Sequence, residues 1–408
     1  MLDTGDTAFV LVSSAMVMLM TPGLALFYGG MVRAKNVLSM LLQNFFLLGV
    51  ASVVWALVGY SLAFGTDAFG GLIGNLDHIG LTGVGQEPTE GSTIPHLAFM
   101  IFQAMFAIIT PALVTGALAE RAKFGALMLF FVIWQIFIYS PAAHWVWGPD
   151  GWIGSKLGAL DFAGGTVVHI LSASTAAALI VIVGPRIGNQ EQAMPPHSLP
   201  LTVLGAGLLW FGWFGFNAGS ALAANGLAAS AFVVTHLAAA AATVAWVAAE
   251  WLHQGRPTML GGASGCIAGL VAITPAAGFV GPMPALIIGL LAGLACYGGI
   301  LLKNKLGYDD SLDVIGIHGI GGTLGAILTG VFATTAVNPD GADGLFSGNP
   351  GLVGAQIVAV LATIAFGFLG SLVLGFIVHK TIGLRVSPDH EIIGLDKTEH
   401  AESGYDML

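Results

Sequence analysis

Eleven long apolar runs follow one another along the 408-residue chain and restrict the folds available to it. An α-helix needs about 20 apolar residues to cross the hydrocarbon core of a bilayer. Charged residues make up only 8% of the chain, against about 25% in an ordinary soluble domain. The sequence therefore predicts an all-α polytopic membrane protein with eleven transmembrane helices. The predicted spans are residues 8–30, 37–64, 96–118, 124–141, 164–184, 199–219, 228–251, 259–275, 284–302, 311–333 and 352–379.

Lysine and arginine are shared unequally between the two sides that these runs define. Lys156 alone falls on one side. Because cytoplasmic loops carry an excess of basic residues, the N-terminus is predicted outside and the C-terminus inside. The first run follows two acids and no basic residue, unlike a signal peptide, and is predicted to stay as a span. The predicted cytoplasmic side holds Arg33, Lys35, Arg121, Lys123, Arg186, Arg256, Lys303, Lys305, Lys380, Arg385 and Lys397.

The order of runs and loops suggests an internal duplication. Five runs precede a polar linker, and five more runs and one extra run follow it. Because five is odd, the second half must enter the membrane from the opposite face, which predicts an inverted repeat with its site where the halves meet. The predicted divisions are a first half at 1–184, a cytoplasmic linker at 185–198, a second half at 199–335, an outer loop with the eleventh helix at 336–380, and a cytoplasmic tail at 381–408.

Each half ends in a span that carries a histidine eight residues after an aspartate: Asp161 before His169, and Asp310 before His318. Eight helical residues rise about 12 Å, so in a core about 30 Å thick both rings are predicted near the midplane and close together. Ionisable groups inside a membrane usually have a function. The alternative is two unrelated core histidines, each bonded to a carbonyl. The three acids Asp161, Asp310 and Asp313 are predicted to cap helix starts.

Buried imidazoles are predicted to be neutral or to share one proton, which suits a small polar solute better than a cation filter made of carboxylates. The net charge of −10 argues against nucleic acid as a partner. Cys266 and Cys296 lie in apolar runs and are interpreted as packing residues. An HExxH motif is absent, and the histidines lack nearby carboxylate ligands. No metal, no cofactor and no enzymatic activity are therefore predicted.

Several motifs together resemble the ammonium transporter (Amt) family, which is related to the Rhesus proteins. They are PGLALFYGGMVRAKNVLSM (22–40), GALAERAKF (116–124), AAHWVWGPDGW (142–152), ALDFAGGTVVH (159–169), GWFGFNAGSALAAN (212–225), DVIGIHGIGG (313–322) and GLRVSPDHEIIGLD (383–396).

The resemblance implies a role for particular positions. Paired pore histidines match His169 and His318, and a largely structural acid matches Asp161. An outer recruitment site for ammonium matches Phe106, Trp147 and Ser220, and a phenylalanine gate below it matches Phe106 and Phe216. The family also implies homotrimers, a PII-type regulatory protein as a cytoplasmic partner, and a regulatory role for the tail.

Transport of ammonium or ammonia, and of methylammonium, across the cell membrane is the predicted function. Ammonium would be recruited outside, deprotonated near the gate, and passed as ammonia along the histidines. Two alternatives are a Rhesus-like gas channel and an ammonium sensor with weak transport; the 29 residues after His379 disfavour an appended signalling domain. From the residues alone, Phe106 and Phe216 equally suit core or lipid-facing packing, and Trp147 suits an interfacial belt with Trp145 and Trp152.

Overall fold

Long helices form nearly all of the regular structure in the computed structural model, which describes residues 1–405. Within that range a further apolar helix, Met259–Ile273, has only 15 residues. The prediction of an all-helical polytopic membrane protein is confirmed, with ten of the eleven predicted spans long enough on their own. The ten helical stretches that are long and apolar enough to cross a membrane are Thr4–Met31, Ala34–Phe64, His96–Leu118, Phe124–Lys156, Gly165–Val183, Leu199–Gly219, Gly226–Gln254, Pro282–Leu306, Ile315–Phe332 and Gly351–Thr381.

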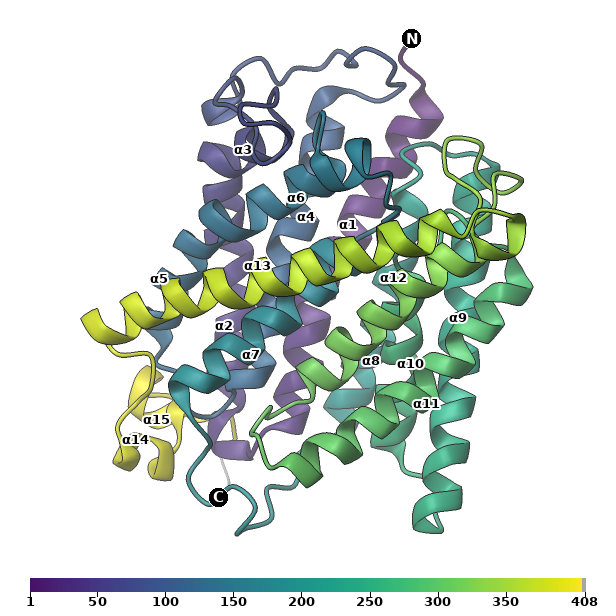
Figure 1. Cartoon of the computed structure of the whole chain (residues 1–408). Coiled ribbons are helices and arrows are strands. Elements are labelled where there is room, and N and C mark those ends of the chain that lie inside the picture. The colour runs from purple at the N-terminus through teal and green to yellow at the C-terminus, as the bar shows by residue number, and fades with distance from the viewer. Residues whose placement is uncertain (406–408) are drawn as a thin grey trace.

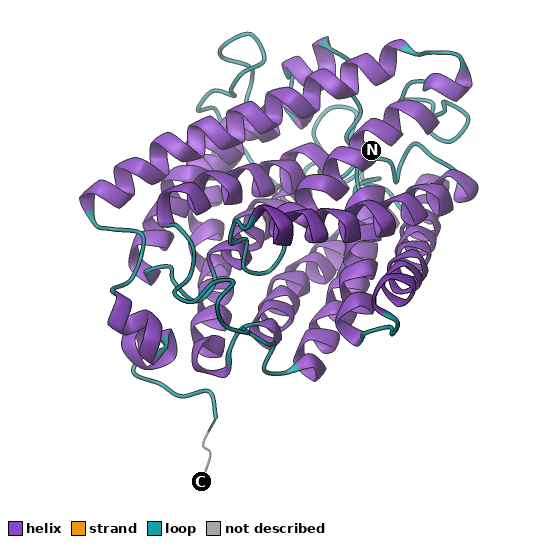
Figure 2. Cartoon of the chain, turned by 60° about the horizontal axis from the view of Figure 1, so that its bottom comes forward, coloured by secondary structure: helices purple, strands orange, loops and turns teal. Residues whose placement is uncertain are grey.

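Several of these stretches consist of consecutive segments. The α-helices are α1 (Thr4–Met31), α2 (Val37–Val54), α3 (Tyr60–Phe64), α4 (His96–Thr115), α5 (Phe124–Trp134), α6 (Ser140–Trp147), α7 (Leu171–Val183), α8 (Leu199–Gly219), α9 (Gly226–Gln254), α10 (Met259–Ile273), α11 (Pro282–Leu306), α12 (Ile320–Phe332), α13 (Gly351–Thr381), α14 (Pro388–Ile393) and α15 (Leu395–His400). Wider π-helical turns are η2 (Trp55–Gly59), η5 (Gln135–Tyr139), η6 (Trp152–Lys156), η7 (Gly165–Ile170) and η8 (Ile315–Gly319). Short 3₁₀ turns are η1 (Ala34–Asn36), η3 (Ile79–Leu81), η4 (Gly116–Leu118) and η9 (Leu345–Ser347). The described residues contain isolated β-bridges but no strand (Figure 2).

The fourth predicted span ends too early at residue 141. The helix passes through Pro141, which directly follows the wide turn η5. A proline is tolerated inside a transmembrane helix where a local π-helical adjustment satisfies the backbone groups that it frees. The longer helix carries Trp147, at the end of α6, close to the segment before η7.

The helices pack at close range where glycine removes a side chain. α1 lies along α8, and α9 packs against α10 and α11. A side chain at Gly269 or Gly289 would collide with the backbone of Ala238, and one at Gly265 or Gly293 would press on that of Ala242. These glycines therefore let the helix backbones approach closely. α13 crosses the outside of the bundle obliquely, over α7, α12 and α5 (Figure 1).

Charged groups gather at the end of the bundle that carries the C-terminal tail. Glu120 accepts from Arg33 at 2.5 Å and from Arg186 at 3.4 Å. Arg186 also pairs with Asp309 at 2.8 Å, whose other oxygen lies 3.6 Å from Arg121. The loops that follow the first, third and fifth spans are thereby joined to the loop before η8, and all of them lie at one end of the molecule.

Candidate transport site

His169 and His318 meet in the middle of the protein. Their Nδ1 atoms are 3.2 Å apart, and the rings lie nearly parallel with centroids 5.2 Å apart. Both side chains are buried. The prediction that the two rings are neighbours is confirmed, although it counted helical residues from Asp161, which lies before the helix. The helix starts at Gly165 rather than at Asp161, so His169 lies in the first turns of the helix and not eight helical residues along it.

A contact between two Nδ1 atoms determines which nitrogen of each neutral ring donates and which accepts a hydrogen bond. One Nδ1 must donate a proton and the other must accept it, so one Nε2 is left as an acceptor and the other as a donor. The Nε2 of His169 is buried and has no hydrogen-bond partner within residues 1–405. His318 lines a small cavity on the tail side. The pair therefore offers a passing solute both hydrogen-bonding characters.

Each histidine sits in a π-helical turn that an aspartate caps. Asp161 accepts from the backbone N–H groups of Gly164, Gly165 and Thr166 at 2.7–2.8 Å, and from the Thr166 hydroxyl. Asp310 accepts from two backbone N–H groups at the start of the second histidine helix, at 2.7 and 3.1 Å. Such wide turns are often found at functional sites, and capping satisfies the amides that a helix start leaves free.

Asp313, the third acid predicted to cap a helix, does not do so. Its carboxylate pairs with Lys303 at 2.5 Å, while Asp310 makes the capping bonds. Asp313 has a left-handed backbone (φ 62°), which points the chain into the wide turn η8. The spacing of acids in the sequence could not separate these two roles.

Aromatic rings fill the space next to His169. Phe216 lies nearly parallel to its ring at 6.2 Å, and Phe106 lies over Phe216 with centroids 4.3 Å apart. Trp213 also stacks on His169, at 5.5 Å and 24°, and donates its indole N–H to Thr274 at 2.8 Å. Phe106 and Phe216 are fully buried, so they are core residues and not lipid-facing ones.

A cavity of about 200 Å³ opens on the other side of Phe106. It brings together the three residues of the predicted recruitment site, Phe106, Trp147 and Ser220, which come from α4, α6 and the end of α8. No charged side chain lines it in the described part of the chain. The other lining residues are Phe64, Phe99, Gln103, Phe162 and Leu222.

Two hydrogen bonds orient the walls of this cavity. The indole N–H of Trp147 donates to the backbone carbonyl of Asp161 at 2.9 Å, and its ring meets Phe106 edge to face at 5.7 Å. The Ser220 hydroxyl donates to the Phe216 carbonyl at 2.8 Å, so its oxygen remains able to accept. Trp145 differs from Trp147: it packs on Trp152 and Phe366 away from the cavity.

Trp213 and the tail-side cavity were missed by the sequence reasoning. Trp213, Phe216 and Ser220 follow one another at helical spacings of three and four, which places them on one face of α8; that spacing was the available signal. The tail-side cavity, about 10 Å³, joins His318 to Tyr28, Leu113, Leu312 and other apolar residues. No periodicity in the sequence marks it, because its walls come from distant helices.

The cavity at Phe106, the Phe106–Phe216 pair and the two histidines follow one another inside a bundle of membrane-spanning helices. This arrangement defines a multi-pass membrane protein that conducts a small polar solute.

Comparison with known proteins narrows the class. The model of the Ammonium Transporter Family matches residues 8–405. The ammonium transporter of Bacillus subtilis (strain 168) is 52% identical over 406 residues, 99% of each chain. Amt1 of Archaeoglobus fulgidus, an ammonium transporter, is 48% identical over 99% of this chain and 100% of its own. The crystal structure of Saccharomyces cerevisiae Mep2 has a TM-score of 0.90 at 35% identity, over 100% of this chain and 94% of that one.

The chain belongs to the ammonium transporter family, as its motifs predicted. It is a multi-pass protein of the cell membrane and a transport protein, not an enzyme.

Proposed function

We propose that the protein moves ammonium across the cell membrane by binding it as the ion and conducting it as ammonia. One observation carries the proposal: the features needed follow one another without a gap. The outer cavity ends on Phe106, Phe106 stacks on Phe216, Phe216 lies against His169, and His169 bonds His318, which faces the tail-side cavity.

The outer cavity supplies what an ammonium ion needs and an apolar molecule does not. A cation is attracted to aromatic faces by about 2 kcal/mol or more where water is excluded, and Phe106 and Trp147 offer such faces. Ser220 accepts one N–H. The Phe106–Phe216 stack then blocks the ion, because moving a bare charge into an apolar path is costly. Losing a proton there lets neutral ammonia continue, with the histidine nitrogens as hydrogen-bonding partners.

The proposed topology has the N-terminus outside and the tail in the cytoplasm, with inverted halves at residues 1–184 and 199–335 joined by the cytoplasmic linker 185–198. Residues 336–380 then form an outer loop and the last span, and 381–408 the cytoplasmic tail. Two features support this. Arg33, Arg121 and Arg186 gather at the tail end, as the positive-inside rule asks. The two histidine helices also start alike, each with an aspartate cap and a wide turn.

We propose three partners beyond ammonium. Methylammonium is a substrate, since it keeps a cationic ammonium group of similar size. The assembly is a homotrimer with one pore in each subunit, and a PII-type protein binds the cytoplasmic side. Family membership supports each of these proposals.

The test is uptake of labelled methylammonium, with current recording, in proteoliposomes. Wild type is compared with His169→Ala, Phe216→Ala and empty liposomes. Uptake above that of empty liposomes, reduced in His169→Ala, is the expected result. Methylammonium uptake no faster than in empty liposomes, together with no ammonium-driven current, would defeat the transport proposal. Ammonium-driven current without methylammonium uptake would remove methylammonium from the proposed substrates.

A further inference from the structure

His144 lies on α6, three residues before Trp147, and its side chain is fully buried. Its ring connects α6 to a distant part of the chain, the end of α3. The Nδ1 atom of His144 is 2.9 Å from the backbone carbonyl oxygen of Ala63. Because a carbonyl oxygen can only accept, Nδ1 carries a proton and donates it, whether or not the ring is charged.

The position of Ala63 explains why its carbonyl needs a donor. α3 ends at Phe64, and the last four carbonyls of a helix have no partner within that helix. Ala63 is itself buried, so its carbonyl depends on a partner inside the protein. His144 therefore satisfies a polar group that the end of α3 leaves free.

A second contact joins the same ring to the loop that follows α3. The Nε2 atom of His144 lies 3.3 Å from Oδ1 of Asp67, which also accepts from the backbone N–H of Gly71 at 2.7 Å. His144 thus holds both the last turn of α3 and the start of the next loop against α6.

The bond to Ala63 also explains the glycine that follows Trp147. A Cβ atom added to Gly148 would lie 2.4 Å from Nδ1 of His144 and 2.5 Å from the carbonyl oxygen of Ala63. The φ angle of Gly148 is −72°, which residues with a side chain adopt freely. Glycine is therefore needed here for the close approach of the two groups and not for its conformation.

Both ends of this connection lie next to walls of the cavity lined by Phe106, Trp147 and Ser220. Phe64 follows Ala63 directly and lines the same cavity. Trp147 is the last residue of α6, a helix of eight residues. The place of its indole ring therefore depends on how the end of this short helix is held.

We propose that His144 is a positioning residue for the capture of ammonium and acts through Trp147. Its bond to Ala63 fixes the end of α6 against the end of α3, so the indole already lies against Phe106 when the cation arrives. A binding group that is ordered in advance costs less entropy on binding, so the bond lowers the KM and leaves the maximal rate unchanged. The inference rests on the proposed function, since Trp147 recruits the cation only if the cavity binds it.

The test is the concentration dependence of labelled methylammonium uptake in proteoliposomes, which gives KM and the maximal rate separately. His144→Leu removes both contacts of the ring. His144→Asn keeps an N–H donor near the position of Nδ1 and loses the contact with Asp67. Gly148→Ala leaves His144 in place but separates it from Ala63.

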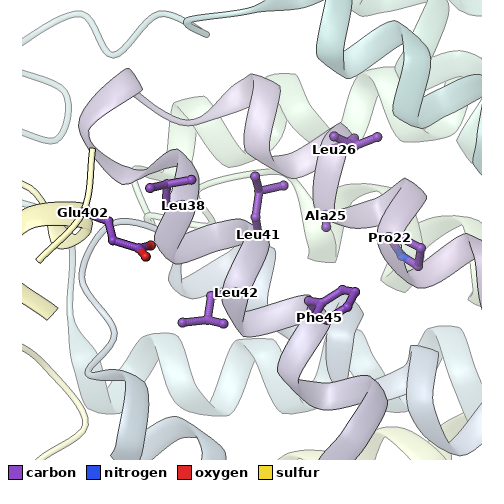
Figure 3. A pocket seen from close by; sticks show the side chains of 8 residues that line it. All are labelled: Pro22, Ala25, Leu26, Leu38, Leu41, Leu42, Phe45 and Glu402. Carbon is purple, nitrogen blue, oxygen red and sulfur yellow. The ribbon is translucent and has the colours of Figure 1, made fainter. Parts of the chain in front are cut away.

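His197 provides a matched control at the tail end of the molecule, away from α3 (Figure 1). Its Nδ1 also bonds a backbone carbonyl, that of Val32, at 2.8 Å, and its Nε2 bonds the Tyr405 hydroxyl. At this end Glu402 of the tail and Leu38 of α2 line an apolar groove of their own (Figure 3). His197→Leu therefore removes a similar pair of bonds without reaching the cavity at Trp147.

His144→Leu and Gly148→Ala should each raise KM about twofold to tenfold, as expected for the loss of one hydrogen bond. His144→Asn should restore most of the wild-type KM, and His197→Leu should match the wild type. The effects of His144→Leu and Trp147→Leu should not add. The double variant should have the KM of Trp147→Leu to within about twofold, because the ring through which His144 acts is gone.

Three results would overturn the inference while the proposed function stands. The first is a wild-type KM in Gly148→Ala and in the His144 variants, in a protein whose KM responds to Trp147→Leu. The second is full additivity in the double variant, and the third is a fall in maximal rate alone. Gel filtration checks that each protein is intact, and Gly148→Ala decides if His144→Leu does not fold. No uptake by the wild type would defeat the proposed function first, and the inference with it.

Discussion

The Nδ1 atoms of His169 and His318 lie 3.2 Å apart, each on a wide helical turn whose start is capped by an aspartate. Each ring uses its Nδ1 in the contact with the other ring, and its Nε2 stays outside that contact. The pair is therefore held by its own hydrogen bond and by two rigid helix starts, rather than by other polar side chains.

Replacing either histidine by leucine should slow transport. His169→Leu or His318→Leu removes one hydrogen-bonding group from an apolar path and leaves the other Nδ1 unpaired. A lost buried hydrogen bond costs about 1–3 kcal/mol, so methylammonium uptake should fall about tenfold or more. His253→Leu is the control, since His253 bonds Tyr297 on the tail-side part of α9. Uptake equal to wild type in both pore variants would show that the pair has no part in conduction.

Trp147 should set the apparent affinity for the cation. Trp147→Leu removes an aromatic face worth about 0.5–2 kcal/mol for a cation, so the KM for methylammonium should rise about twofold to thirtyfold with little change in maximal rate. Trp147→Phe keeps a ring but loses the bond to the Asp161 carbonyl, and its KM should lie between the two. Trp145→Leu, outside the cavity, should leave KM unchanged. An unaltered KM in Trp147→Leu would exclude this ring from recruitment.

Trp213 should support His169 mainly through packing. Trp213→Ala removes a fully buried ring that stacks on His169, and large-to-small changes of this kind lower the free energy of unfolding by about 3–5 kcal/mol. Heating the detergent-solubilised protein and following its loss of monodispersity measures the change. Trp251→Ala, at a position 58% exposed on α9, should have little effect. Similar melting of the two variants would contradict the packing role.

Asp161 should matter for the fold of the site more than for its charge. Asp161→Ala leaves the amides of Gly164, Gly165 and Thr166 without their acceptor, and loss of a cap costs about 0.5–2 kcal/mol. Thermal stability and uptake should fall together. Asp161→Asn keeps one acceptor oxygen and should lie between wild type and Asp161→Ala. The cap Asp3 of α1, exposed at the N-terminus, gives Asp3→Ala as control. Full stability of Asp161→Ala with lost uptake would instead indicate an electrostatic role.

The charged layer at the tail end should make the protein acid-sensitive. Burial raises the pKa of Asp309. Hydrogen bonds from Arg186 and the charge of Arg121 lower it by more, so the net pKa lies below its usual value. Burial likewise raises the pKa of Glu120, and its bonds with Arg33 and the charge of Arg186 lower it below the ordinary value. A carboxylate with a depressed pKa stabilises the fold above its unfolded pKa, about 4, and loses that effect as pH falls through its folded pKa.

Arg186→Gln tests this dependence. It leaves two buried carboxylates short of a partner and should cost about 3–5 kcal/mol at neutral pH. The stability gap between wild type and Arg186→Gln should shrink as pH falls below about 4, in melting experiments from pH 3 to pH 7. Arg256→Gln, at an exposed arginine, should track the wild type. A gap that stays constant with pH would mean that Arg186 acts without these carboxylates.

The chain's long apolar runs made the helices predictable, and the repeated aspartate–histidine spacing made the central pair predictable. Both signals are local in the sequence. Both follow from one physical requirement, that a chain in lipid satisfies its backbone polar groups internally, within long helices and at capped helix starts. Helix ends were less predictable. Pro141 indicated a helix end, but the helix continues through it directly after the wide turn η5. Wide turns cannot be recognised from hydrophobic periodicity.

The walls of the site were harder to predict from the residues alone. Phe106 and Phe216 come from α4 and α8, and nothing in either helix distinguishes them from the other phenylalanines. Their positions came from the family resemblance. Gln103 and Trp213 were not found, because a cavity lined by several helices depends on how those helices cross. The angles at which the helices cross are set by side-chain packing and not by the hydrophobic pattern of any one helix.

The cavity lined by Phe106, Trp147 and Ser220 holds no formal charge, because the nearby carboxylate of Asp161 accepts hydrogen bonds from backbone amides. Attraction to aromatic faces and a hydroxyl acts over a few ångströms, whereas attraction to a free carboxylate would reach through the solvent and weaken as salt is added. If ammonium binds in this cavity, as proposed, its affinity should therefore change little with the ionic strength of the medium.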